Sequence, residues 1–173
     1  WMTLRTSASD LYSLSETPGY LTLKCADISA TEKKTPAFVC RRLQHHKFEC
    51  TTRMLFDPSD DKEMAGMLLF KDETHQYLLA VGKDDSGKCI TLGKVGALNT
   101  EILARQDIGE EMKVVDLKII SEGNYYDFYY SVANENWQLL CKNVAATYLS
   151  TSVAGGFTGT TIGLYATTKR QNR

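Results

Sequence analysis

The sequence has little net charge, few prolines and no long apolar run. Its 173 residues carry a formal net charge of −1 and include only 3 prolines. A nearly neutral chain gains little long-range attraction for nucleic acid or for an anionic membrane, so neither partner is expected. No apolar run approaches the roughly 18 residues of a membrane span. The chain begins at Trp1 without a signal-peptide pattern, which suggests a fragment or a processed product.

The chain has 5 cysteines, which cannot all form disulfides with one another, and none of them has C-x-x-C spacing. They are Cys25, Cys40, Cys50, Cys89 and Cys141. An odd number cannot pair fully, and a local zinc site lacks its usual spacing. We therefore expect reduced, apolar core cysteines. Free thiols are typical of a reducing compartment, although the periplasm is also open. The compartment stays unknown, with a bacterial cytoplasm or periplasm favoured.

The motifs of common catalytic centres are missing as well. The sequence has no G-x-S-x-G elbow, phosphate-binding loop or dinucleotide fingerprint. In a strand His45 and His46 point to opposite faces and do not share a metal. The acidic run 57–63 lacks the calcium-loop spacing, and the adjacent pair Glu110 and Glu111 is typical of a charged loop. No catalytic residue, metal or cofactor is expected, so the chain is not predicted to be catalytic by itself.

Alternating apolar and polar residues are what the sequence does contain. In Phe48–Phe56 every second residue, beginning with Phe48, belongs to a single face that is mostly apolar. The same period of two recurs in Tyr77–Val81, Val115–Ile119 and Tyr126–Val132. This period predicts half-buried β-strands.

Turn-forming residues separate these strands at short intervals. Asp84–Gly87, Ser121–Asn124 and Asn134–Asn136 are each predicted to reverse the chain. Helical patterns are weak: Asp60–Met67 could form one short turn, and Thr100–Gln106 is ambiguous. Short strands with frequent turns favour an all-β sandwich of two antiparallel sheets with little helix. Without a linker or repeat, residues 1–173 are predicted to form a single domain.

One aromatic residue stands between glycines, in the segment Gly155-Gly156-Phe157-Thr158-Gly159. Glycines on both sides allow positive φ angles that would project the ring of Phe157 outward from a loop. The alternative is a bulge or tight turn that tucks the ring inward. The residues alone leave both open.

Several motifs, taken in order, resemble one known domain. They are Pro18–Leu23, Phe38–His45, Ala65-Gly66, Phe128–Ser131 followed by Trp137, and Leu149–Tyr165 with its Gly-Gly-Phe-Thr-Gly segment. From about Trp1 to Tyr165 the chain resembles the C-terminal concanavalin-A-like (jelly-roll) sandwich of family-43 glycoside hydrolases. That family comprises β-xylosidases and α-L-arabinofuranosidases.

The resemblance implies a partner that this chain does not contain. The family's catalytic domain is an upstream β-propeller in the same chain, whose carboxylates hydrolyse xylo-oligosaccharides or arabinosides with inversion. Nothing here resembles that propeller, so a C-terminal fragment of a larger glycosidase is implied. The sandwich would pack on the propeller, and a loop phenylalanine would close one side of its sugar pocket. By motif position this residue is Phe157, with Gly156 and Thr158 beside it as further substrate-binding residues.

Two departures from the family, the missing propeller and the way the chain ends, keep other functions open. Members continue into a final strand where this chain ends at Thr167–Arg173, so that strand is either absent or supplied by the N-terminal segment. One alternative function is an independent carbohydrate-binding module in which Tyr129 or Trp137 stacks on a sugar. Another is an orphan interaction domain that self-associates through its exposed former interface.

Overall fold

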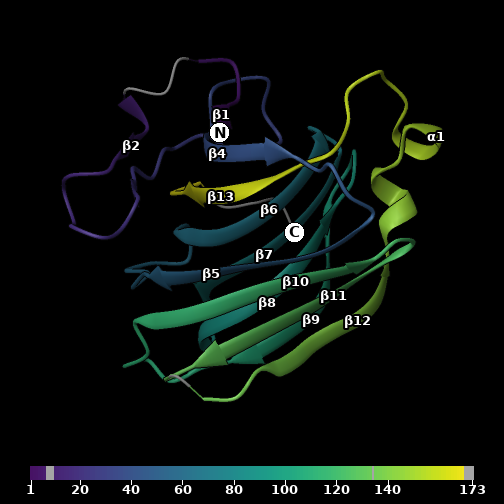
Figure 1. The fold of residues 1–173 in the computed structure, drawn as a ribbon. Coiled ribbons are helices and arrows are strands. Elements are labelled where there is room, and N and C mark those ends of the chain that lie inside the picture. Colours follow the sequence, from purple (N-terminus) through teal and green to yellow (C-terminus); the bar gives the residue numbers. More distant parts are fainter. Residues whose placement is uncertain (7–9, 134, 170–173) are drawn as a thin grey trace.

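Two antiparallel sheets face each other in the computed structural model, which describes residues 1–6, 10–133 and 135–169. The larger sheet has seven strands in the order β1-β4-β13-β6-β7-β8-β9 (Figure 1). Its strands are β1 (Met2–Thr3), β4 (Ala37–Arg42), β6 (Met64–Asp72), β7 (His75–Asp84), β8 (Gly87–Val95), β9 (Thr100–Asp107) and β13 (Thr161–Thr167).

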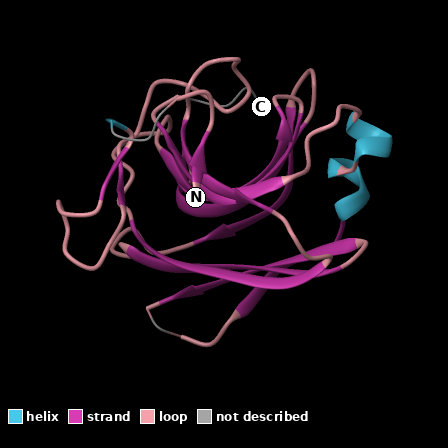
Figure 2. Cartoon of the chain, turned by 45° about the horizontal axis from the view of Figure 1, so that its top comes forward, coloured by secondary structure: helices cyan, strands magenta, loops and turns pink. Residues whose placement is uncertain are grey.

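The second sheet has four strands in the order β12-β11-β10-β5 and lies across the first (Figure 2). Its strands are β5 (Lys47–Leu55), β10 (Val114–Glu122), β11 (Tyr125–Val132) and β12 (Gln138–Ala145). A small hairpin pairs β2 (Tyr12–Ser13) with β3 (Thr22–Leu23). Two short helical segments, η2 (Ala146–Leu149) and α1 (Thr151–Ala154), connect β12 to β13. The predicted all-β sandwich is confirmed.

The main core lies between the two sheets and follows the predicted alternation. In β10, Leu117 is fully buried in this core, while its neighbours Asp116 and Lys118 belong to the opposite face. Leu117 is opposite Thr52 of β5 and Tyr130 of β11, so inward positions stay in register across the sheet. The period-two pattern therefore identified the core face of this sheet correctly.

The central strands of the seven-stranded sheet are buried on both faces, which the sequence did not predict. Tyr77 and Leu79 of β7 pack into the main core, whereas Leu78 and Ala80 join a second apolar cluster on the other face. Ala30 belongs to this second cluster, so the N-terminal segment covers that face. The prediction that β7 is half-buried was therefore wrong, because a third layer shields its outer side.

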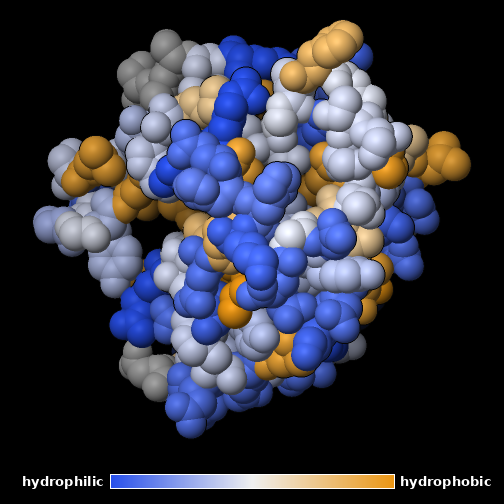
Figure 3. Space-filling view, turned by 45° about the vertical axis from the view of Figure 1, so that its right-hand side comes forward, coloured by the Kyte–Doolittle hydropathy of each residue, from blue (hydrophilic) through white to orange (hydrophobic). Residues whose placement is uncertain are grey.

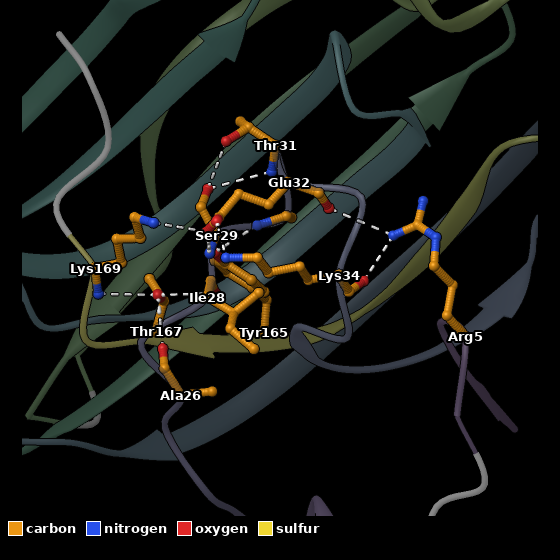
Figure 4. Close-up of polar contacts among 11 residues, drawn as sticks. Arg5, Ala26, Ile28, Ser29, Thr31, Glu32, Lys34, Tyr165, Thr167 and Lys169 are labelled. Atoms are coloured by element: carbon orange, nitrogen blue, oxygen red, sulfur yellow. Dashed lines mark hydrogen bonds and ion pairs between the residues drawn. The ribbon is translucent and has the colours of Figure 1, made fainter.

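Hydrogen bonds fasten the N-terminal segment to β13 (Figure 4). The backbone N–H of Ala30 donates to the phenolic oxygen of Tyr165 at 3.1 Å. The Thr167 hydroxyl donates to the carbonyl oxygen of Ala26 at 3.0 Å. These bonds satisfy polar groups at the margin of the apolar cluster, where an unpaired donor would be costly.

Turn predictions agree with the structure better than helix predictions. Asp84 and Gly87 face each other across a two-residue turn, and Gly123 connects β10 to β11 with a φ of 95°. β12 pairs antiparallel with β11, although Asn134 of the predicted turn between them lies outside the described residues. The prediction of a helical turn at Asp60–Met67 was wrong, because β6 begins at Met64 and continues as a buried strand.

The ambiguous segment Thr100–Gln106 is part of the strand β9. At the other edge of the sheet, the N-terminal segment supplies β1, whose Met2 pairs with Cys40 of β4. In the described part of the chain no helix is long and apolar enough to cross a membrane.

Cysteine burial follows the prediction with one exception. Cys40 and Cys89 are buried, while Cys50 and Cys141 are partly buried against the main core. Desolvation raises the pKa of the Cys40, Cys50 and Cys141 thiols above the ordinary value, which keeps them protonated. Cys25 is exposed, so its assignment to the core was wrong: it lies in the loop after β3 rather than in a sheet.

Candidate functional site

Phe157 lies at the tip of the loop between α1 and β13 and is fully exposed, with a relative accessibility of 107%. Gly155 and Gly156 have φ angles of 72° and 70°, in the left-handed region. A Cβ atom at either glycine would meet nothing within 4 Å, so backbone conformation alone favours glycine here. The ring projects outward, while its role in substrate binding stays a prediction.

The loop is anchored by a buried lysine that sequence reasoning missed. Lys71 is only 4% exposed, and its ammonium donates to the carbonyl oxygen of Thr158. The same Nζ atom lies 3.4 Å from the Thr151 hydroxyl of α1. The pairing of β6 with β7 shifts between Phe70 and Asp72, and this irregularity brackets Lys71. Nothing in the local sequence distinguishes it from an ordinary lysine at a strand end.

The base of the helical connection is fixed by Tyr148. Its hydroxyl lies 2.7 Å from the carbonyl oxygen of Val95 and 3.0 Å from that of Thr74. The Lys94 ammonium lies 4.8 Å from the centre of its ring. Burial raises the pKa of Tyr148, so the phenol stays neutral and can donate to these carbonyls. η2 is thereby joined to two turns of the seven-stranded sheet.

An open cleft of about 400 Å³ lies beside the base of the loop. Leu43 and Thr160 line the cleft, and the Leu43 N–H donates to the Thr160 carbonyl oxygen at 3.0 Å, which joins the cleft to the end of the loop. Polar side chains of the cleft include His45, His46 and Asn124. These side chains can offer hydrogen bonds within the cleft, whose lining does not include Phe157.

Two acidic residues from the candidate pairs and runs of the sequence form ion pairs. Glu110 binds the Lys83 ammonium at 3.0 Å and accepts the Lys88 backbone N–H at 2.8 Å, so its pKa is lowered. Asp57 contacts Lys88 at 2.7 Å and Lys113 at 2.9 Å, and hydrogen bonds from both lower its pKa to about 2. A general acid needs a raised pKa instead. The contacts of both residues are ion pairs and hydrogen bonds within the fold.

The remaining sequence candidates do not gather at the loop. His45 and His46 lie between β4 and β5, so the prediction that they point to opposite faces of a strand was wrong: both line the cleft as exposed side chains. The described residues hold no group of three or more potential metal ligands. Tyr129 and Trp137 lie near one lysine, Lys118, which belongs to the four-stranded sheet. Figure 3 shows the side of the molecule that carries α1 as largely hydrophilic, with hydrophobic side chains in separate spots.

The two facing antiparallel sheets and the buried core between them define the class of this protein as a β-sandwich. Over residues 1–173 the sequence matches the family described as the β-xylosidase C-terminal concanavalin A-like domain. The chain belongs to that family.

Relatives agree with this assignment. A xylosidase/arabinosidase from Butyrivibrio fibrisolvens is 35% identical over 164 residues, which cover 92% of this chain and 30% of the relative. The structure of GH43B from the Bacteroides ovatus xyloglucan locus superposes with a TM-score of 0.86 at 26% identity, covering 96% of this chain and 32% of that one. A xylan β-1,4-xylosidase from Bacillus halodurans gives 0.85 at 26% identity, covering 93% and 32%. The chain therefore spans about a third of the length of these relatives.

Proposed function

We propose that this chain is the accessory β-sandwich of a β-xylosidase or α-L-arabinofuranosidase type of glycoside hydrolase. It packs on a catalytic β-propeller and closes one side of the sugar pocket with the Phe157 loop during hydrolysis of xylo-oligosaccharides. The observation that carries the proposal is the fully exposed ring of Phe157 on a loop fixed from below, in a chain of this family.

The physical argument concerns the state of Phe157 without a partner. An exposed phenylalanine ring gains about 1.5–3 kcal/mol when it is buried. A propeller pocket supplies that burial, and a sugar ring supplies C–H groups that pack on an aromatic face. Because Gly155 and Gly156 have no side chains, the loop is narrow enough to enter a confined space. Closure by the ring would also exclude water around the scissile bond.

Further apolar side chains lie at the same end of the sandwich. Val153 of α1 and Leu98 of the turn between β8 and β9 are 55% and 95% exposed. Val153 comes shortly before the start of β13, where Thr161 pairs with Phe70 near the end of β6. Leu98 comes shortly after Val95 at the end of β8, and hydrogen bonds of the Tyr148 hydroxyl join Val95 and Thr74 to the helical connection before β13. We propose this end as the side that faces the propeller.

The test joins this chain to the propeller of a relative and changes Phe157→Ala. Loss of one buried phenylalanine contact should lower kcat/KM on xylobiose by roughly tenfold or more. Leu55→Ala is the matched control, because Leu55 is 59% exposed at the far end of β5 and is expected to leave the kinetics unchanged. Unchanged kinetics for Phe157→Ala would refute the pocket role. An equal effect on a p-nitrophenyl arabinoside would assign the loop to both substrates.

A further inference from the structure

A second group of aromatic and polar side chains lies on the outer face of the four-stranded sheet. It forms an open groove of about 370 Å³, whose lining includes Arg53, Asp116, Ser131, Glu135 and Trp137. The groove is near the end of β11, whereas the Phe157 loop follows η2 and α1 at the opposite end of that strand. It is therefore separate from the pocket-facing loop.

Trp137 is held in place yet accessible. The ammonium of Lys118 lies 4.3 Å from the centre of its ring and 5.3 Å from that of Tyr129. Lys118 is 12% exposed, whereas Trp137 keeps 40% exposure. The cation occupies one side of the indole and fixes its orientation. The exposed part of the indole remains available for a ligand to stack on.

The cations that line or adjoin the groove are matched by carboxylates. Arg53 makes a bidentate pair with Asp116, with both nitrogen–oxygen distances at 2.8 Å. Lys118 lies 3.9 Å from Glu49. Glu135 adds a further negative charge to the lining. Such a surface does not favour an anion such as phosphate, but it offers fixed donors and acceptors to an uncharged ligand.

A pyranose ring has complementary chemistry. Its C–H groups form an apolar face that packs on an aromatic ring, whose face carries partial negative charge. Its hydroxyls donate and accept at the rim, and each Asp116 oxygen keeps acceptor capacity after bonding to Arg53. The Ser131 hydroxyl is buried and donates to the Glu135 carbonyl oxygen at 2.7 Å.

We propose that this groove binds a neutral chain of β-1,4-linked pyranoses, with one sugar stacked on Trp137 and its hydroxyls bonded to the Arg53–Asp116 pair. The site would hold a polysaccharide strand apart from the catalytic pocket. The choice of a β-1,4-linked chain among neutral sugars rests on the proposed function.

The experiment titrates the 173-residue chain with xylohexaose and with cellohexaose while amide and indole NMR signals are followed. Signals of Trp137, Arg53 and Asp116 should shift with at least one of the two sugars. Trp137→Ala should weaken binding by about tenfold, the size of one aromatic stacking contact. Trp1→Ala is the matched control, because Trp1 is 82% exposed and does not line the groove.

The proposal is overturned by the absence of any shift with either sugar at about 10 mM, a concentration that detects weak binding, or by Trp137→Ala binding as tightly as the unchanged chain. Arg53→Lys keeps the charge but loses the bidentate fork, so it should also weaken binding. Thermal melting of each variant checks that it folds. Shifts confined to the Phe157 loop would reject the groove and leave the pocket role intact, since this test involves no catalysis.

Discussion

The buried ammonium of Lys71 donates a hydrogen bond to the carbonyl oxygen of Thr158, the residue that follows Phe157. This contact holds the backbone next to a ring that has no packing of its own. The two glycines before Phe157 allow the loop to leave the fold, and Lys71 limits how far it moves. Rigid support below and exposure above are the combination that a pre-organised contact residue requires.

Lys71→Met should loosen the Phe157 loop while the sheets remain folded. The variant keeps an unbranched chain of similar length in β6 but loses the donor to Thr158. Hydrogen bonds to charged groups contribute about 1.5–3 kcal/mol, so local amide exchange in the loop should rise by roughly tenfold or more. Hydrogen exchange read by NMR measures this. Lys142→Met, at an exposed position of β12, is the control. Equal protection in both variants would show that Lys71 is not the anchor.

Gly163→Ala should destabilise the whole domain. A Cβ atom there would stand 2.2 Å from the Val39 carbonyl oxygen and 2.5 Å from the Cys40 Cα, both backbone atoms of the neighbouring strand β4. Overpacking of this kind costs about 1–3 kcal/mol of unfolding free energy. Urea denaturation monitored by fluorescence gives the loss. Gly159→Ala is the comparison, because its Cβ meets nothing within 4 Å. A loss no larger than the one in that variant would contradict the explanation.

Stability at acidic pH should depend on Glu32. Hydrogen bonds from Lys169 and Lys34 and from the Ser29 N–H lower its pKa from 4.5 to about 2. Because the folded pKa is below the ordinary one, this stabilisation is present above pH 4.5 and is lost as the pH falls toward 2.

Glu32→Gln removes this pH-dependent contribution to the free energy of unfolding. The variant should be less stable than the unchanged chain at pH 6 and approach it at low pH. Urea midpoints across that range measure the difference. Glu16→Gln, an exposed position in the loop after β2, serves as control. A stability gap between the chain and Glu32→Gln that stays constant with pH would count against the assignment.

We expect the isolated chain to self-associate through the end of the sandwich that is proposed to face the propeller. Val153 and Phe157 expose apolar surface that a partner would cover. Sedimentation velocity at rising concentration should show reversible dimers, and Val153→Ser combined with Phe157→Ser should reduce them. Leu14→Ser, an exposed substitution in the N-terminal segment, is expected to change nothing. A strictly monomeric chain would dismiss the idea.

The sequence predicted the features that depend on local periodicity. Phe48–Phe56 alternated because β5 has one face on the core, and the glycines around Phe157 marked a loop because only they take positive φ readily. The burial of Leu78 was not predictable, since it depends on a distant N-terminal segment, whose Ala30 covers that face. Lys71 was missed for the same reason: its partner Thr158 is 87 residues away.

The place of β13 has a consequence for how the chain folds. This strand comes from the C-terminal part of the chain, yet it lies inside the seven-stranded sheet between β4 and β6. Tyr165 also bonds to Ala30, 135 residues earlier. On a ribosome, β4 and β6 would leave the exit tunnel long before the strand that pairs with both. Their open edges invite pairing with other chains, and such a high contact order slows folding. Expression should therefore depend strongly on chaperones and temperature.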